Sequence, residues 1–270
     1  ETIFSSEQVG ALRMVIAGLI LLPFGIYNLK KITSFKFFFS ILGVGLFGNF
    51  FPAFLFTYAE QGLSSGYTGM LNSFTPVFTI ILGAIFFKSR LTSIQFSGLF
   101  ISILGVALLI KTGGDSIDNN SVSFKYTVAV VLATLCYAIS LNLIKHMLSS
   151  LKAIETTSLA FTFTLLPALI IGWNSNVIAT IKTNDFALEG LFFIGILALF
   201  GTALAVILFN KLTINTTTLF ASSVTYLIPI VAVLIGVGFG EQISFSQVIS
   251  MAVVLIGIFV ANRKKRIRAV

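Results

Sequence analysis

Long runs of apolar residues recur along the whole chain and are separated by short polar connections. Most are long enough, at about 1.5 Å of rise per residue, to cross the ~30 Å hydrocarbon core of a bilayer as helices. They lack the strict two-residue alternation that is typical of membrane-barrel strands. The pattern predicts an all-α integral membrane protein with nine transmembrane helices visible. The predicted spans are residues 10–29, 37–59, 66–87, 94–110, 126–146, 156–173, 190–210, 216–239 and 246–262.

The basic residues between the predicted spans are unequally divided between the two sides of the membrane. When the connections are assigned alternately, one side collects thirteen Lys and Arg residues and the other side collects three. Because positive charge is concentrated on the cytoplasmic side, the richer side is predicted to be cytoplasmic. This orientation predicts a multi-pass protein of the cytoplasmic (inner) membrane, with a cytoplasmic C-terminus and residue 1 outside.

The composition agrees with a membrane protein and excludes an ordinary soluble domain. Hydrophobic residues make up 57% of the 270 residues and charged residues 10%, against about 25% charged in soluble domains. The net charge of +8 would suit nucleic-acid binding in a soluble protein, but five of the basic residues lie within residues 263–268, next to the last span. No aromatic residue is interleaved with them for base stacking. We therefore expect membrane lipids as partners and no nucleic acid.

Two parts of the chain resemble each other at a nearly constant offset. The offset is 153 residues in the first two pairs below and 152 in the third, and the change falls in a connection, where a deletion is tolerated. The matched residues include Gly48 with Gly201, Pro76 with Pro229, and Gly105 with Gly257.

On this alignment the span at residues 126–146 has no counterpart, and its counterpart would precede residue 1. The repeat unit then has five helices, an odd number, so the two copies must insert in opposite orientations. We predict a ten-helix fold of two inverted five-helix repeats with the first helix missing. Residues 1–111 form the first repeat, with four helices, and residues 112–270 form the second, with five.

Two matched spans carry a proline near the middle, on a face of small and polar residues. Proline cannot donate a backbone hydrogen bond and interrupts a helix, and discontinuous helices mark the central site of inverted-repeat transporters. Tight packing of helices through small residues is the alternative. The cavity interpretation is favoured because the prolines share this face in both copies. These candidate residues are Ser65, Asn72 and Pro76 in one copy, and Thr218, Ser222, Thr225 and Pro229 in the other.

Further polar side chains lie inside the spans, and we add Asn49, Tyr137 and Thr202 to the candidate substrate-binding residues. Singly, such residues are more often hydrogen-bonded to a neighbouring helix than to a ligand. Arg13 lies about one turn into the first span. An intramembrane charge is a functional candidate, but so shallow an arginine is expected to reach the outer interface or to brace helix ends.

The chain lacks the residue clusters that catalysis or cofactor binding would need. No Asp or Glu lies near the middle of a predicted span, and His146, the sole histidine, lies at a span end. Phosphate-loop and H-E-x-x-H motifs are absent. We expect no catalytic residues, no metal and no cofactor. Coupling to a proton or another ion stays open, since the missing helix can hold a coupling residue.

The chain resembles the EamA-type transporters of the drug/metabolite transporter superfamily. The resemblance rests on Ala11-Leu12-Arg13 and Ala17-Gly18, on Pro76 with Arg90-Leu91-Thr92, Gln95 and Gly105, and on Pro229 with Gly240-Glu241, Gln247 and Gly257. The first copy has Lys88-Ser89 where the second keeps Gly240-Glu241. The resemblance implies ten helices in two inverted repeats, both termini in the cytoplasm, and export of small molecules.

These observations predict a multi-pass membrane transporter that exports small metabolites, amino acids or drugs by alternating access through a central cavity. A channel or facilitator is the alternative, and it would give non-saturating flux. A structural subunit or a membrane-embedded enzyme is less favoured. The substrate, the coupling ion and the oligomeric state are not specified by these patterns.

Overall fold

The computed structural model describes residues 3–88, 92–113, 120–217, 220, 221, 224, 227–240 and 243–262. Within these residues every regular element is a helix. The α-helices are α1 (Ser6–Asn28), α2 (Phe35–Gly45), α3 (Phe51–Ala59), α4 (Ser65–Leu71), α5 (Thr75–Phe87), α6 (Ser93–Gly113), α7 (Asn120–Met147), α8 (Ala153–Asn174), α9 (Val177–Thr183), α10 (Ala187–Ile196), α11 (Ala205–Asn215), α13 (Leu227–Gly238) and α14 (Phe245–Asn262). Short non-α turns join some of them: η1 (Leu29–Lys31) and η3 (Asn72–Phe74) are 3-10 turns, and η2 (Leu46–Phe50) and η5 (Leu197–Leu204) are π-helical.

Seven of the nine predicted spans are confirmed as helices that are long and apolar enough to cross a membrane. They comprise α1 with η1, α2–η2–α3, α4–η3–α5, α6, α7, α8 and α10–η5–α11. The apolar part of α14, Phe245–Ala261, is shorter than these seven. The eighth predicted span, residues 216–239, is described only in part, as α13 and a few residues before it.

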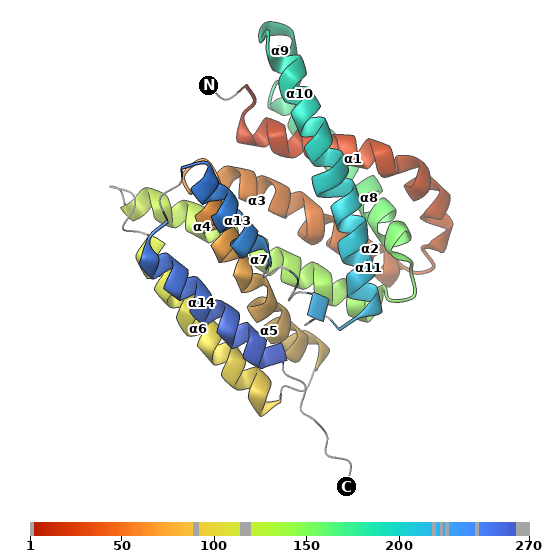
Figure 1. The fold of residues 1–270 in the computed structure, drawn as a ribbon. Coiled ribbons are helices and arrows are strands. Elements are labelled where there is room, and N and C mark those ends of the chain that lie inside the picture. Colours follow the sequence, from red (N-terminus) through yellow and green to blue (C-terminus); the bar gives the residue numbers. More distant parts are fainter. Residues whose placement is uncertain are drawn as a thin grey trace.

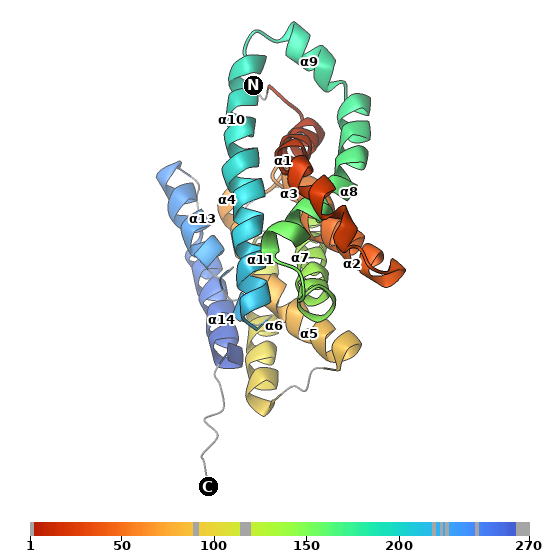
Figure 2. The ribbon, with the colours of Figure 1, turned by 90° about the vertical axis from the view of Figure 1, so that its right-hand side faces the viewer.

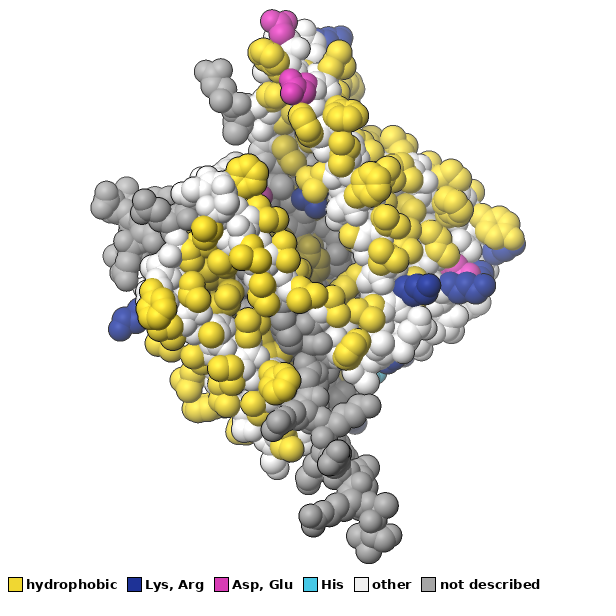
Figure 3. All heavy atoms as spheres, in the orientation of Figure 1, with side chains coloured by type: hydrophobic (Ala, Val, Ile, Leu, Met, Phe, Trp, Pro, Cys, Tyr) yellow, Lys and Arg dark blue, Asp and Glu magenta, His cyan; other side chains and the backbone are white. Residues whose placement is uncertain are grey.

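The outer surface of the bundle is apolar. Figure 3 shows hydrophobic side chains over most of one face, with the charged groups confined to a few places. Leu234 of α13 and Phe193 of α10 are 69% and 60% exposed. Such exposure would be costly in water, and it matches a protein whose solvent is the acyl-chain region of a bilayer.

Helix α9 was not predicted from the sequence. It follows Asn176, whose φ of 57° is left-handed, and joins the ends of α8 and α10 at one tip of the molecule (Figure 2). The helix has seven residues and mixes polar with apolar side chains. A segment so short and so mixed gives no hydropathy signal, because it does not need to cross the membrane.

Helices far apart in the sequence pack side by side. Helix α1 lies against α8, α4 against α13, and α6 against α14 (Figure 1). Glycine permits the last of these close crossings, since a Cβ at Gly105 of α6 would lie 2.6 Å from the backbone nitrogen of Val254. A Cβ at Gly257 of α14 would lie 2.5 Å from Oγ of Ser102. Small residues at such positions let two backbones approach within van der Waals distance.

Basic side chains hold helices together at the end of the bundle where α7 and α11 end. Lys31 Nζ forms an ion pair of 2.6 Å with Glu155 Oε1 at the start of α8. Lys145 Nζ of α7 donates hydrogen bonds to the carbonyl oxygens of Ile214 and Thr216 at the C-terminus of α11. A cation there satisfies terminal carbonyls and interacts favourably with the helix dipole.

Candidate functional site

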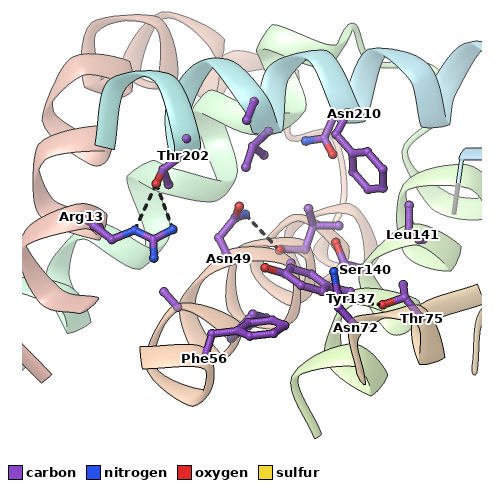
Figure 4. A pocket seen from close by; sticks show the side chains of 18 of the residues that line it. Arg13, Asn49, Phe56, Asn72, Thr75, Tyr137, Ser140, Leu141, Thr202 and Asn210 are labelled. Carbon is purple, nitrogen blue, oxygen red and sulfur yellow. Dashed lines mark hydrogen bonds between the residues drawn. The ribbon is translucent and has the colours of Figure 1, made fainter. Parts of the chain in front are cut away.

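A cavity of about 440 Å³ lies inside the bundle, where α1, the α2–η2–α3 span, α7 and the η5–α11 segment meet. Figure 3 shows the hollow between two apolar parts of the surface, and Figure 4 shows the side chains around it. Its volume falls in the ~300–1,000 Å³ range of small-molecule sites. Its wall combines apolar and polar residues: Arg13, Met14, Val44, Gly48, Asn49, Pro52, Ala53, Phe56, Glu60, Asn72, Thr75, Tyr137, Ser140, Leu141, Ile144, Gly201, Thr202, Ala205, Val206, Phe209, Asn210 and Ile228.

A proline-induced break brings Asn72 to the cavity. Helix α4 ends at Leu71, η3 covers Asn72–Phe74, and Pro76 is the second residue of α5. Pro76 has no N–H to offer the carbonyl of Asn72, and this carbonyl accepts from the N–H of Thr75 instead. The Thr75 hydroxyl also donates to Oδ1 of Asn72 over 3.3 Å. The predicted discontinuity at Pro76 is therefore confirmed, and both polar side chains beside it line the cavity.

Two π-helical turns present Asn49 and Thr202 to the cavity from the α2–η2–α3 and α10–η5–α11 spans. Each side chain donates to the carbonyl five residues earlier, Asn49 Nδ2 to Val44 over 3.5 Å and Thr202 Oγ1 to Leu197 over 3.3 Å. The two residues are 153 positions apart, and so are the two carbonyls. Pro52 has no N–H to offer the carbonyl of Gly48, but η5 is equally π-helical with Ala205 at the matching position. Such turns are frequent at functional sites.

Arg13 lies on the cavity wall, deeper than the one turn that the sequence suggested. Helix α1 begins at Ser6, whose preceding residue Ser5 forms a capping box with Gln8, so Arg13 is about two turns inside. Its Nε and Nη2 donate to the Thr202 hydroxyl, both over 3.4 Å. In the part of the chain that the structure describes, the ion pair found is Lys31–Glu155, and Arg13 joins none.

The remaining wall mixes polar and apolar side chains. Asn49 is only 6% exposed, and among the described residues its Oδ1 has no hydrogen-bond partner. Tyr137 stacks on Phe56 with ring centroids 5.8 Å apart. Leu141, Ile144 and Phe209 add apolar surface to the wall, and Ser140 and Asn210 beside them add polar groups. The cavity thus offers a cation, hydrogen-bonding groups and an apolar surface to one small molecule.

The structure brings four of the ten predicted site residues together on the cavity wall: Asn49, Asn72, Tyr137 and Thr202. Ser65 is instead the exposed first residue of α4, and Pro76 is buried, so neither lines the cavity. The other four predictions cannot be placed in this way. Thr218, Ser222 and Thr225 lie outside the described residues, and so does the side chain of Pro229, which is in α13.

Sequence reasoning treated Arg13 as structural and did not select Glu60, Phe56 or Phe209, all of which line the cavity. The glutamate is the C-cap of α3. Because it lies at the end of a span, its position in the sequence did not suggest that it lines the cavity. The two phenylalanines could not be told from the many lipid-facing ones by pattern. Among the described residues no group of three His, Cys, Asp or Glu residues could hold a metal ion.

The model of the EamA-like transporter family matches residues 2–111 and 125–263. The inner membrane transporter YedA of Escherichia coli K12 is 24% identical over 265 residues, which cover 96% of this chain and 82% of YedA. A probable terminal-alkyne amino-acid exporter of Streptantibioticus cattleyicolor is 24% identical over 217 residues, covering 78% of this chain and 68% of that protein. One solved crystal structure aligns with a TM-score of 0.59 at 16% identity, over 95% of this chain and 86% of the other, which shows a shared fold.

Proposed function

Because this chain belongs to the EamA-like transporter family, a family of multi-pass membrane transporters, we propose that it exports a small molecule by alternating access and binds it in the cavity. The observation that carries the proposal is the meeting of three irregular helices at one cavity: the break beside Asn72 and the two π-helical turns. Irregular backbone at membrane depth is tolerated where it lines a cavity, and transporter sites are built there.

Two inverted repeats, residues 1–111 and 112–270, provide the moving parts in this proposal. The equivalent π-helical turns support the repeat, since they recur at a spacing of 153 residues with equivalent side-chain bonds. The crossing of α6 and α14 supports it too. Gly105 approaches Val254, and the residues 152 positions away, Gly257 and Ser102, make the reciprocal approach. Such reciprocity is the mark of a two-fold axis between two contacting elements.

We propose that this chain follows the ten-helix arrangement of the family, with nine membrane spans. In this arrangement α7, which belongs to the second repeat, has no counterpart in the first. We place the C-terminus in the cytoplasm, because the basic connections fall on that side, and the protein in the inner membrane, as YedA is named. Small metabolites, amino acids or drugs are the substrate classes, and export is supported by the name of the Streptantibioticus cattleyicolor relative.

The proposed binding residues are those that line the cavity, Asn49, Asn72, Tyr137 and Thr202. We also propose that Thr218, Ser222 and Thr225, with Pro229, form the matching polar face of the second repeat. Pro76 acts indirectly in this scheme, because it breaks the helix that carries Asn72.

Transport by the full-length natural chain in proteoliposomes tests the proposal. A screen of labelled amino acids, nucleosides and cationic drugs should find at least one compound with saturable uptake and counterflow. Asn72→Leu and Thr225→Val should each lower that uptake at least about tenfold, while Asn174→Leu, at the exposed end of α8, should not.

Non-saturating flux without counterflow would instead indicate a channel. Wild-type uptake by both site variants would refute the site, and no uptake of any compound would refute the proposed transport.

A further inference from the structure

We propose that Arg13 binds the carboxylate of a small organic acid that carries an amino or hydroxyl donor on the neighbouring carbon and an apolar body. This inference rests on the proposed function and names the class of molecule that the cavity takes. It concerns the part of the cavity wall where Arg13, Thr202 and Asn49 come from three different helical segments and face the same space (Figure 4).

The guanidinium of Arg13 has few hydrogen-bond partners among the described residues. An arginine has five N–H donors, and the hydrogen bonds of Arg13 to the described residues go to one neutral hydroxyl, that of Thr202, at the long distance of 3.4 Å. Among the described residues no ion pair joins Arg13 to Glu60, the acidic residue on the same wall. Of the five donors, three have no partner among the described residues.

A positive charge two turns inside a membrane span is expected to have an anionic partner. An arginine in a membrane span is costly and is retained where it serves a buried partner or a water-filled path. Its planar fork matches a carboxylate with two parallel hydrogen bonds. The bond to Thr202 leaves the guanidinium beside the cavity in a fixed place, so a bound carboxylate completes the set of partners.

Asn49 supplies the second polar contact. Its side chain is 6% exposed, its Nδ2 makes one long bond to the Val44 carbonyl, and its Oδ1 is buried without a partner among the described residues. An unpartnered buried acceptor is destabilising unless a ligand or water donates to it. An ammonium or hydroxyl next to the bound carboxylate is such a donor.

The rest of the wall has apolar surface for the body of such a ligand, between polar groups such as Asn72 and Asn210. Phe56, Leu141, Ile144 and Phe209 form this apolar surface together with the ring of Tyr137. A ligand with its charged end at Arg13 would bury its side chain there, as small-molecule sites combine a few polar anchors with an apolar surface. Amino acids and 2-hydroxy acids share this chemistry, and the two can be separated by experiment.

Binding of four matched probes to the purified full-length natural chain tests the inference, by calorimetry and by ligand-dependent thermal shift. The probes are L-phenylalanine, L-phenyllactate, 3-phenylpropionate and L-phenylalaninamide. They share one apolar body, and they differ in whether they carry a carboxylate and a neighbouring donor.

We expect the amide, which lacks the carboxylate, to bind about 10- to 100-fold more weakly than phenylalanine. Phenylpropionate, which lacks the donor, should bind about 3- to 10-fold more weakly. A preference between phenylalanine and phenyllactate tells an amino-acid site from a hydroxy-acid site.

Variants separate a ligand contact from a structural brace. Arg13→Gln should abolish the preference for the acid over the amide, and Arg13→Lys should restore part of it. Asn49→Leu should abolish the preference for phenylalanine and phenyllactate over phenylpropionate. The matched control is Lys182→Gln, which removes an exposed positive charge on α9 and should leave all ratios unchanged.

The inference fails if the wild-type protein binds the amide as tightly as the acids, or if none of the three acids binds saturably. It also fails if Arg13→Gln keeps the preference for acids. The wild-type ratio needs no variant, so a variant that does not fold leaves the test intact. Saturable transport of neutral or cationic compounds alone would refute this inference and leave the proposed transport standing.

Discussion

Arg13 and Thr202 are 189 residues apart in the sequence, and the guanidinium of the first donates to the hydroxyl of the second from both Nε and Nη2. The contact joins α1 to the π-helical turn η5 across the wall of the cavity. Since Thr202 also donates to the Leu197 carbonyl, the position of the guanidinium is tied to the widened turn.

A double-mutant cycle should measure the coupling between Arg13 and Thr202. Arg13→Gln and Thr202→Val are expected to be non-additive in thermal unfolding, with a coupling free energy of about 0.5–1.5 kcal/mol. Thr213→Val is the matched control, because the Thr213 hydroxyl is buried in α11 and bonds the Phe209 carbonyl of its own helix. Additive effects of Arg13→Gln and Thr202→Val would show that the contact contributes nothing.

The crossing of α6 and α14 should be intolerant of added side chains. Gly257→Ala would place a Cβ 2.7 Å from the Gly98 carbonyl oxygen, so we expect a destabilisation of about 1–3 kcal/mol, seen as a lower melting temperature. Gly195→Ala meets nothing within 4 Å and should stabilise helix α10 by about 0.5–1 kcal/mol. Equal melting temperatures for the two variants would contradict the close crossing.

The ion pair between Lys31 and Glu155 should stabilise the folded protein, although it lies near a helix end. The Glu155 side chain is 9% exposed, so Lys31→Met leaves a buried carboxylate with a backbone N–H, that of Lys152, as its other partner. We expect a loss of about 1–3 kcal/mol. Lys36→Met, at an exposed position of α2, is the control and should change the melting temperature little.

Lys145 should hold the ends of α7 and α11 together. Lys145→Met removes the charged donor to the carbonyls of Ile214 and Thr216 and is expected to destabilise the protein by about 1–3 kcal/mol. The same substitution at Lys211, an exposed position of α11, removes no such bond. If both variants melt at the same temperature, the hydrogen bonds of Lys145 to the end of α11 do not stabilise the protein.

The membrane spans could be predicted from the sequence because each segment must by itself be long and apolar enough to lie in the hydrocarbon of the bilayer. A segment that crosses hydrocarbon needs about twenty apolar residues whatever its neighbours are, and seven such helices are present. The break at Pro76 was predictable for the same reason, since the missing N–H is a property of one residue. Helix α9 was not predicted, because a helix that does not cross the membrane needs no long apolar run.

The composition of the site was less accessible. Asn49 and Tyr137 were selected for their depth and do line the cavity, whereas Ser65, selected for its spacing from Asn72, is exposed at the start of α4. The spacing of Ser65 from Asn72 holds along α4, but Ser65 is the first residue of that helix and lies about two turns from Asn72, at the end of the span. The depth of Arg13 was misjudged because α1 begins four residues before the predicted start.

The sequence by itself determined where the chain crosses the membrane, where one of its helices is broken and which segments resemble one another, because these depend on local hydropathy, backbone chemistry and spacing. Only the tertiary structure decided which polar side chains meet. A buried asparagine or arginine has the same local pattern whether it packs against a helix or faces a cavity. Arg13 and Thr202 became partners through the packing of helices that lie 189 residues apart.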